Sequence, residues 1–160
     1  MAKEKSTKTN AVRIAETAKI DFEVINYESD GFMEGTAIAE KLGQPPEQTF
    51  KTLVTKGKPG QFFVFVVPVA EELDLKKAAK AVGEKSVEML PAKDLLATTG
   101  YVRGGCSPIG MKKLFKTIIH QSSKNFDMIM FSGGRLGTQI KMSPQDLARL
   151  IGAEFLDIIK

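Results

Sequence analysis

The hydrophobic pattern of the first half of the chain predicts three strands. Residues 22–27, FEVINY, alternate apolar and polar side chains, as a half-buried strand does. Residues 49–56, TFKTLVTK, are rich in β-branched and apolar side chains and predict a second strand. Residues 61–69, QFFVFVVPV, contain a run that is apolar on both faces, which predicts a strand covered on both sides.

Helices are predicted where apolar residues recur between capping signals. Asn10 can cap a helix through residues 11–19, and Gly43 can end a helix over residues 36–43. Further helices are predicted over residues 75–82 after Asp74, over residues 92–99 after Pro91, and from the capping box SPQD at 143–146 to Gly152.

The second half of the chain predicts consecutive strands over residues 116–121, 126–131 and 138–142, with no helix between them. The last two are joined by SGGRLG, whose three glycines suit a hairpin. Such a run excludes a simple repeating βαβ array. We therefore predict an α/β fold of the α+β type, with a mixed, barrel-like sheet surrounded by helices. SVEML predicts a short strand, and the tail EFLDIIK fits either a last strand or a helical turn.

Length and composition predict one globular domain over residues 11–160, preceded by a flexible basic leader over residues 1–10. The chain has 160 residues, of which 42% are hydrophobic. The leader lacks the apolar stretch of a secretory signal, and no apolar run reaches the ~20 residues that span a bilayer. A single cysteine excludes an internal disulfide. These features predict a cytoplasmic protein with no membrane association.

The sequence offers few residues for common catalytic sites. One histidine and one cysteine make a zinc site improbable, and no phosphate-binding glycine motif follows a strand, so we predict neither metal nor cofactor. Cys106 would need a base to act as a nucleophile, and His120 could serve only if the fold brought it near. The simpler interpretation is that Cys106 fills a small, partly buried site.

Two glycine-rich stretches, residues 104–110 and 132–137, are candidate binding loops. Glycine lets backbone N–H groups approach a carbonyl, an oxyanion or a phosphate. A hairpin explains the second stretch fully. The first is longer and is flanked by Arg103, Lys112 and Lys113, so it can meet a phosphate backbone, although solvated surface charge explains those side chains equally well. The net charge of +4 permits a polyanionic partner without requiring one.

Lys51 is the other candidate. Alternation along the strand places it on one face with Thr49 and Leu53, and the apolar Leu53 indicates that this face is partly buried. That placement slightly favours a functional lysine over an outward-facing polar residue.

Five segments together resemble the YbaK family, which comprises free-standing bacterial aminoacyl-tRNA deacylases related to the editing domain of bacterial prolyl-tRNA synthetases. The segments are TFKTLV, LDLKKAAKAVGEKSVEM, TTGYVRGGCSPIGMKK, FSGGRLG and DLARLIGAEFLDI. The resemblance runs from about Ala11 onward and is greatest to the Cys-tRNA(Pro) deacylase branch.

This resemblance implies a compact fold around a barrel-like sheet, and an enzyme that removes cysteine mischarged onto tRNA(Pro). It also implies a substrate-assisted mechanism, in which the thiol of the substrate cysteine attacks its own ester and leaves as a cyclic thiolactone. The protein then acts by positioning and by electrostatics, which explains the lack of a triad or a metal site. The implied partner is aminoacylated tRNA(Pro), recognised directly or presented by prolyl-tRNA synthetase.

The family motifs assign roles to individual residues of this chain. The implied catalytic groups are Lys51, at the terminal nucleotide or ester, and the backbone of Gly104 and Gly105, at the ester. The implied substrate-binding residues are Tyr27, Phe32, Ser107, Ser132, Gly133, Gly134, Arg135 and Gly137. For contact with tRNA phosphates, our own candidates are Arg103, Lys112 and Lys113.

Three positions depart from the family pattern. Glu34 stands where an aromatic residue is common, and Phe32 can fill that space after a shift of the loop. Gln139 stands where an acidic residue is common, and Cys106 stands where relatives carry an apolar residue, so its thiol is not needed for the family's chemistry. Two alternatives stay open: a non-catalytic module that binds aminoacyl-tRNA or a nucleotide together with a synthetase, and a thiol hydrolase that uses Cys106 and His120.

Overall fold

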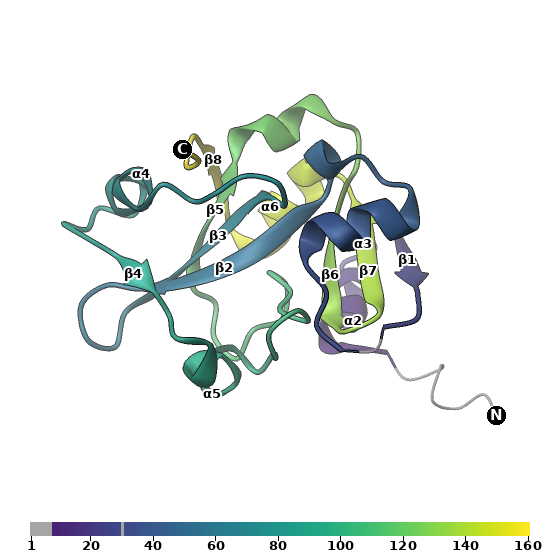
Figure 1. Ribbon diagram of the computed structural model, residues 1–160, viewed down its shortest axis with the longest axis horizontal. Coiled ribbons are helices and arrows are strands. Elements are labelled where there is room, and N and C mark those ends of the chain that lie inside the picture. Colours follow the sequence, from purple (N-terminus) through teal and green to yellow (C-terminus); the bar gives the residue numbers. More distant parts are fainter. Residues whose placement is uncertain (1–7, 30) are drawn as a thin grey trace.

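The strands form two sheets in the computed structural model, which describes residues 8–29 and 31–160 (Figure 1). The smaller sheet is antiparallel, with the order β1 (Phe22–Asn26), β7 (Thr138–Met142) and β6 (Ile129–Arg135). The larger sheet is mixed and has the order β4 (Glu88–Met89), β2 (Phe50–Lys56), β3 (Phe62–Pro68), β5 (Lys116–His120) and β8 (Glu154–Leu156). β3, β5 and β8 run parallel, whereas β2 is antiparallel to both of its neighbours.

The mixed α+β class is confirmed, but the two sheets do not close into a barrel. Within the described residues they are joined by a single parallel bridge between Thr49, just before β2, and Met130 of β6. Pro45 and the 3₁₀ turn η1 (Pro46–Gln48) precede this point. Proline cannot donate a ladder hydrogen bond, so it disfavours extension of the bridge on the side that precedes Thr49.

The helices lie around the sheets and agree with the predicted segments. They are α2 (Asn10–Thr17), α3 (Gly35–Leu42), α4 (Leu75–Ala81), α5 (Leu95–Thr99) and α6 (Pro144–Ile151). The segment predicted after Pro91 begins as the 3₁₀ turn η2 (Ala92–Asp94) before it becomes α5. A further 3₁₀ turn, η3 (Gln121–Asn125), separates β5 from β6, where consecutive strands were predicted. The tail after α6 forms the short strand β8.

The capping signals mostly act where they were predicted. Asp74 accepts hydrogen bonds from the backbone of Lys76 and Lys77, Ser143 caps α6 through Asp146 N, and Gly43 and Gly152 end their helices in the left-handed conformation.

The cap of α2 is the exception, because Thr9 rather than Asn10 provides it. Thr9 Oγ1 accepts from Val12 N at 3.1 Å and also donates to Gly133 O at 2.6 Å. Asn10 is instead the first helical residue. Residues 1–7 of the predicted leader lie outside the described residues; of the other three, Thr9 caps the helix and Asn10 begins it.

The larger sheet is buried on both faces, as the apolar run of β3 predicted. Phe65 and Val67 pack with Ala78 of α4 on one face. Val66 packs on the other face with Phe131 of the smaller sheet and with α2 and α6. Burial on two faces removes apolar area from water on both sides of β2 and β3, which holds these strands in a fixed position. No helix in the described ranges is long and apolar enough to cross a membrane.

Candidate functional site

A cavity of about 320 Å³ lies along β2. Its walls come from the start of α3, from β2, from the segment between β4 and α5, and from the first glycine loop. Polar and glycine residues in its lining include Glu34, Lys51, Arg103, Gly104, Ser132 and Gln139. The cavity therefore collects residues that lie up to about a hundred positions apart in the chain.

β2 leaves part of its edge open at this cavity. β4 pairs with β2 only at Thr55 and Lys56, and Leu90 N donates to Val54 O at 3.0 Å. In an antiparallel ladder, the N–H and C=O groups of alternate residues point to the same side. The backbone groups of Thr52 therefore point, like those of Val54, toward this open edge. The Thr52 hydroxyl is also buried without a hydrogen-bond partner among the described residues. β4 thus leaves the Thr52 side of this edge without a strand pair, next to the cavity.

Lys51 lies in the cavity lining on the adjacent part of β2. Its Nζ donates to Val69 O at 3.3 Å, just after the end of β3. Thr49 is buried and Leu53 is half-buried, so the predicted partial burial of this strand face is confirmed. The ammonium group is thereby held at the cavity by a neutral carbonyl, and within the described part of the chain it forms no ion pair.

The two glycine loops pack against each other beside the cavity. Gly104 lines it with φ +85°, and a Cβ at this position would lie 2.9 Å from Phe32 Cδ1. Gly105 lies outside the lining, and a Cβ there would lie 2.9 Å from Arg135 Cα. The Gly105 N–H donates to Val102 O at 2.9 Å. Gly105 therefore allows the close approach of the second loop, while Gly104 faces the cavity.

Phe32 and Arg103 lie together at the wall of the cavity. The Arg103 guanidinium carbon lies 4.2 Å from the centre of the Phe32 ring, which is an attractive cation–π distance. Phe32 keeps 45% of its surface exposed. The pair thus presents a flat, cationic surface to solvent at the cavity.

Other residues implied by the resemblance lie at different distances from the cavity. Ser132 lines it, and Tyr27 reaches it indirectly, because the Tyr27 hydroxyl accepts from Gln139 Nε2 at 3.3 Å. Ser107 is fully buried, and its hydroxyl accepts from Ile109 N at 3.3 Å. The residues of the β6–β7 hairpin that lie outside the lining are Gly133, Gly134, Arg135 and Gly137.

Two of the three basic candidates for phosphate contact lie away from the cavity. Lys112 Nζ donates to Ala97 O at 3.2 Å, beside α5. Lys113 lines a second cavity of about 190 Å³, together with Ile14 and Leu150. Only Arg103 of the three belongs to the first cavity.

Cys106 and His120 do not form a catalytic pair. Cys106 lines the cavity but packs with Val54 and Tyr101, and burial raises the pKa of its thiol to about 12. A thiol with that pKa is protonated near neutrality and is a poor nucleophile. The side chain of Cys106 is hydrogen-bonded to Thr99 and not to a histidine.

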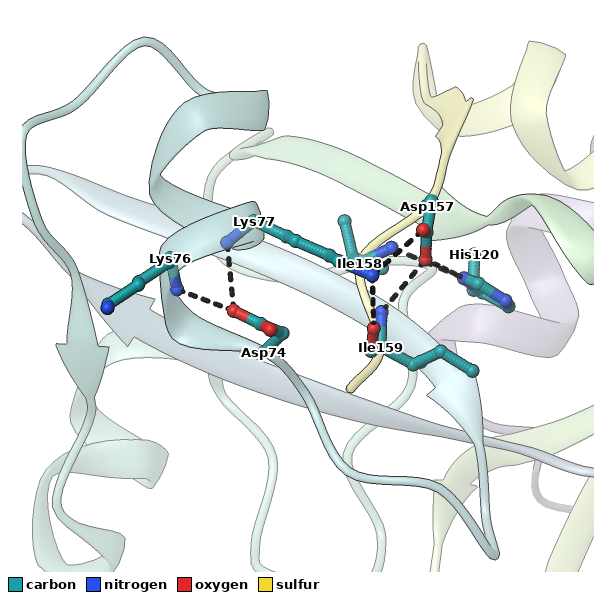
Figure 2. Close-up of polar contacts among 7 residues, drawn as sticks. All are labelled: Asp74, Lys76, Lys77, His120, Asp157, Ile158 and Ile159. Carbon is teal, nitrogen blue, oxygen red and sulfur yellow. Dashed lines mark hydrogen bonds and ion pairs between the residues drawn. The ribbon is translucent and has the colours of Figure 1, made fainter.

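His120 lies in a separate polar cluster at the C-terminal end of the chain (Figure 2). Its Nδ1 accepts from Ile158 N at 3.3 Å and lies 3.8 Å from Asp157 Oδ1. Lys77 donates to Asp157 Oδ2 at 2.9 Å. Burial lowers the pKa of His120 despite the nearby Asp157 carboxylate. These contacts describe a packed structural histidine and give no support to the thiol hydrolase alternative.

Sequence reasoning missed one wall of the cavity. Met89, Leu90 and Leu95 form an apolar side opposite the start of α3. Their segment was predicted as a short strand and a helix, but no local signal indicates that it crosses the edge of β2. In the described part of the chain, no group of three or more histidine, cysteine, aspartate or glutamate side chains could hold a metal ion.

Comparison with known proteins gives related sequences across the whole chain. The model of the family described as the aminoacyl-tRNA editing domain matches residues 33–150. An Enterococcus faecalis protein named "Putative Cys-tRNA(Pro)/Cys-tRNA(Cys) deacylase EbsC" is 45% identical over 160 residues, which cover 99% of this chain and 98% of that protein. The proline–tRNA ligase of Thermosipho africanus is 34% identical over 77 residues, which are 48% of this chain and 14% of the ligase.

Solved structures share the fold at lower sequence identity. One, described as a "putative trans-editing enzyme for prolyl tRNA synthetase", matches with a TM-score of 0.81 and 22% identity, covering 96% of this chain and 99% of the other. The hypothetical protein APE2540 matches with a TM-score of 0.85 and 19% identity, covering 95% and 100%. At these identities the likeness concerns the fold alone.

Proposed function

The chain belongs to the aminoacyl-tRNA editing domain family, and we propose from this premise that it is a trans-editing deacylase for cysteine mischarged onto tRNA(Pro). The proposal is supported by the similarity to the named Cys-tRNA deacylase along nearly the full length of both chains. The observation that carries it is the cavity itself: Lys51, Gly104 and the open edge of β2 line one space that contains no activated nucleophile.

The chemistry then comes from the substrate. The thiol sulfur of the esterified cysteine attacks the ester carbonyl carbon and forms a C–S bond. The bond between that carbon and the ribose oxygen breaks, and the thiol proton passes to the ribose oxygen. The products are a cyclic thiolactone and tRNA with a free terminal hydroxyl, and water opens the thiolactone to free cysteine. No protein side chain is covalently changed in these steps.

The protein contributes position and charge. We assign to Lys51 the binding of the terminal nucleotide or of the ester. Its ammonium group can stabilise the negative charge that develops on the ester as its carbonyl carbon is attacked. The backbone at Gly104 faces the ester, and Gly105 lets the second loop approach closely enough to shape that wall. To the backbone of Thr52, which faces the open edge of β2, we assign a hydrogen bond to the bound ester.

The tRNA extends from the cavity along the basic surface. Phe32 and Arg103 can stack and pair with the terminal nucleotide at the wall of the cavity. Lys112 and Lys113 lie beyond it and suit phosphates further along the acceptor stem. The similarity to a segment of proline–tRNA ligases supports an association with that enzyme, which would present the mischarged tRNA.

A panel of charged tRNAs tests the proposal. Single-turnover deacylation is measured on Cys-tRNA(Pro), Ala-tRNA(Pro) and Cys-tRNA(Cys), each with and without prolyl-tRNA synthetase. We expect the fastest release of cysteine from tRNA(Pro) and slow release of alanine, which has no thiol. Rates equal to buffer on all three substrates would overturn the proposal, and tight tRNA binding without hydrolysis would favour the non-catalytic module.

A further inference from the structure

The cavity contains one acidic side chain that the proposed chemistry does not use. Glu34 lines it directly before α3, together with the cations Lys51 and Arg103. Among the residues that the structure describes, it is the only carboxylate in this lining. The cavity thus offers one negative and two positive side chains to whatever binds there.

The charge of Glu34 forms neither a helix cap nor an ion pair within the described residues. It occupies the N-cap position of α3 in extended conformation, yet its side chain makes no capping hydrogen bond. No lysine or arginine within the described ranges lies within ion-pair distance of it, and its side chain is exposed. A negative charge at a helix N-terminus interacts favourably with the helix dipole, so this position suits an acidic side chain.

Val69 fixes Glu34 near Lys51. The next residue, Gly35, lies so close to the Val69 side chain that a Cβ on Gly35 would come within 2.8 Å of Val69 Cβ. Lys51 Nζ binds the carbonyl of the same Val69. Val69 thus contacts both Lys51 and the residue that follows Glu34, and the two opposite charges form no ion pair with each other.

This arrangement matches the charges of an aminoacyl end of tRNA. An amino acid esterified through its carboxyl group keeps a free α-amino group, which is largely protonated near neutrality, and it adjoins the anionic phosphate of the terminal nucleotide. We propose that the Glu34 carboxylate binds the α-ammonium group of the esterified amino acid. Lys51 and Arg103 lie on the side of the anionic terminal nucleotide and can bind it. This inference rests on the proposed function and adds a selectivity to it: the enzyme accepts free aminoacyl esters and disfavours N-blocked esters, such as peptidyl-tRNA.

Paired substrates test this assignment, because N-acetylation removes the ammonium charge but keeps the thiol and the ester. Glu34→Gln removes the carboxylate charge and keeps the side-chain volume. At pH 6.5 we expect Glu34→Gln to lower kcat/KM for Cys-tRNA(Pro) about tenfold, as loss of one charge-assisted hydrogen bond does. For N-acetyl-Cys-tRNA(Pro), the wild-type protein and the variant should agree within about twofold, since neither can make that bond.

Glu40→Gln is the matched control, because Glu40 lies exposed on the same helix and outside the cavity lining. It should leave both rates within about twofold of the wild-type values. Equal loss on both substrates in Glu34→Gln, or no loss on either, would overturn the assignment. Thermal unfolding of both variants separates these results from a loss of folded protein.

A non-hydrolysable probe keeps the inference independent of catalysis. Adenosine that carries cysteine through a 3′-amide is titrated against the wild-type protein and Glu34→Gln, with and without N-acetylation. The same pattern is expected in Kd: about tenfold weaker binding of the free-amine probe to the variant, and equal binding of the acetylated probe. If the probe behaves so while charged tRNA is not hydrolysed, the inference stands and the proposed function fails. Equal affinity of both proteins for the free-amine probe overturns the inference.

Discussion

Lys51 holds its charge at a half-buried position through a single bond to a backbone carbonyl. Replacing it with alanine removes charge from the cavity but breaks no ion pair, so the cost in stability is small. We expect Lys51→Ala to lower the single-turnover rate on Cys-tRNA(Pro) at least about 100-fold, the effect typical of losing one group that stabilises developing charge.

Lys56→Ala provides the control for that experiment. Lys56 lies on the same strand, is also half-buried, and stands outside the cavity lining. Its replacement should change the rate less than about threefold. Similar losses in the two variants would mean that general positive charge on β2, rather than Lys51, serves the substrate.

Cys106 offers a direct contrast, because its thiol lies in the cavity wall but is held protonated. Burial raises its pKa to about 12. We expect Cys106→Ala to alter the deacylation rate less than about threefold, and iodoacetamide at pH 7.5 to leave the folded wild-type enzyme active. A loss of ~10⁴-fold or more in a folded variant would instead identify Cys106 as a nucleophile.

At the scale of elements, the two glycine loops lie in close backbone contact beside the cavity. A methyl group on Gly105 would meet the Arg135 backbone, which cannot move as a side-chain tip can. Gly105→Ala should lower the free energy of unfolding by about 1–3 kcal/mol, as overpacking does, and should also lower the deacylation rate because the loops are forced apart.

Gly43→Ala separates those two effects. Gly43 ends α3 at φ +67°, and nothing lies within 4 Å of an added Cβ. Its replacement costs about 1–2 kcal/mol of left-handed strain and leaves the loops in contact. Urea denaturation with parallel rate measurements should therefore show lost stability in both variants and a slowed reaction in Gly105→Ala alone.

The elements that the sequence predicts well are those with local signals. The caps at Asp74 and Ser143 depend on residues two or three positions away, and strand alternation correctly indicated the burial around Lys51. Local signals could not indicate that Thr9, rather than Asn10, caps α2. Thr9 is selected by a bond to Gly133 O, 124 positions along the chain.

Contacts between distant parts of the chain also limited the prediction of the whole fold and of the candidate site. Strand spacing predicts a mixed sheet, but closure depends on which edges meet, and here one bridge from Thr49 to Met130 replaces a ladder. Gly104 and Gly105 look equivalent in the sequence. Only the folded chain separates them, since the Gly105 N–H binds Val102 O while Gly104 faces the cavity. The apolar wall at Leu90 likewise forms because the segment after β4 lies against the edge of β2, and no local sequence pattern indicates that contact.

The pH dependence of stability is a property of the whole fold through His120, which joins β5 to the C-terminal segment. Burial lowers its pKa in the folded state, with Lys77 adding to this and with Asp157 and Glu71 opposing it. The unfolded chain therefore takes up the proton first as the pH falls. Stability should begin to decline below the unfolded value of about 6.5 and continue to fall down to the folded pKa.

His120→Gln removes this linkage and should flatten that part of the profile. We expect the free energy of unfolding, measured in urea between pH 7 and pH 5, to decline less steeply in the variant than in the wild-type protein. Glutamine is uncharged in both the folded and the unfolded chain over this range, so it takes up no proton. Parallel profiles would mean that other groups set the acid sensitivity.

The open edge of β2 has a consequence for how binding can be observed. Thr52 pairs with Val66 of β3, but its backbone amide points to the other edge of β2, where β4 pairs only with Thr55 and Lys56. We therefore expect its hydrogen to exchange with deuterated solvent faster than the amides of Lys51 and Leu53, which face β3. Occupancy of the cavity can thus be followed at a single residue, as slowed exchange at Thr52 while its neighbours stay protected throughout.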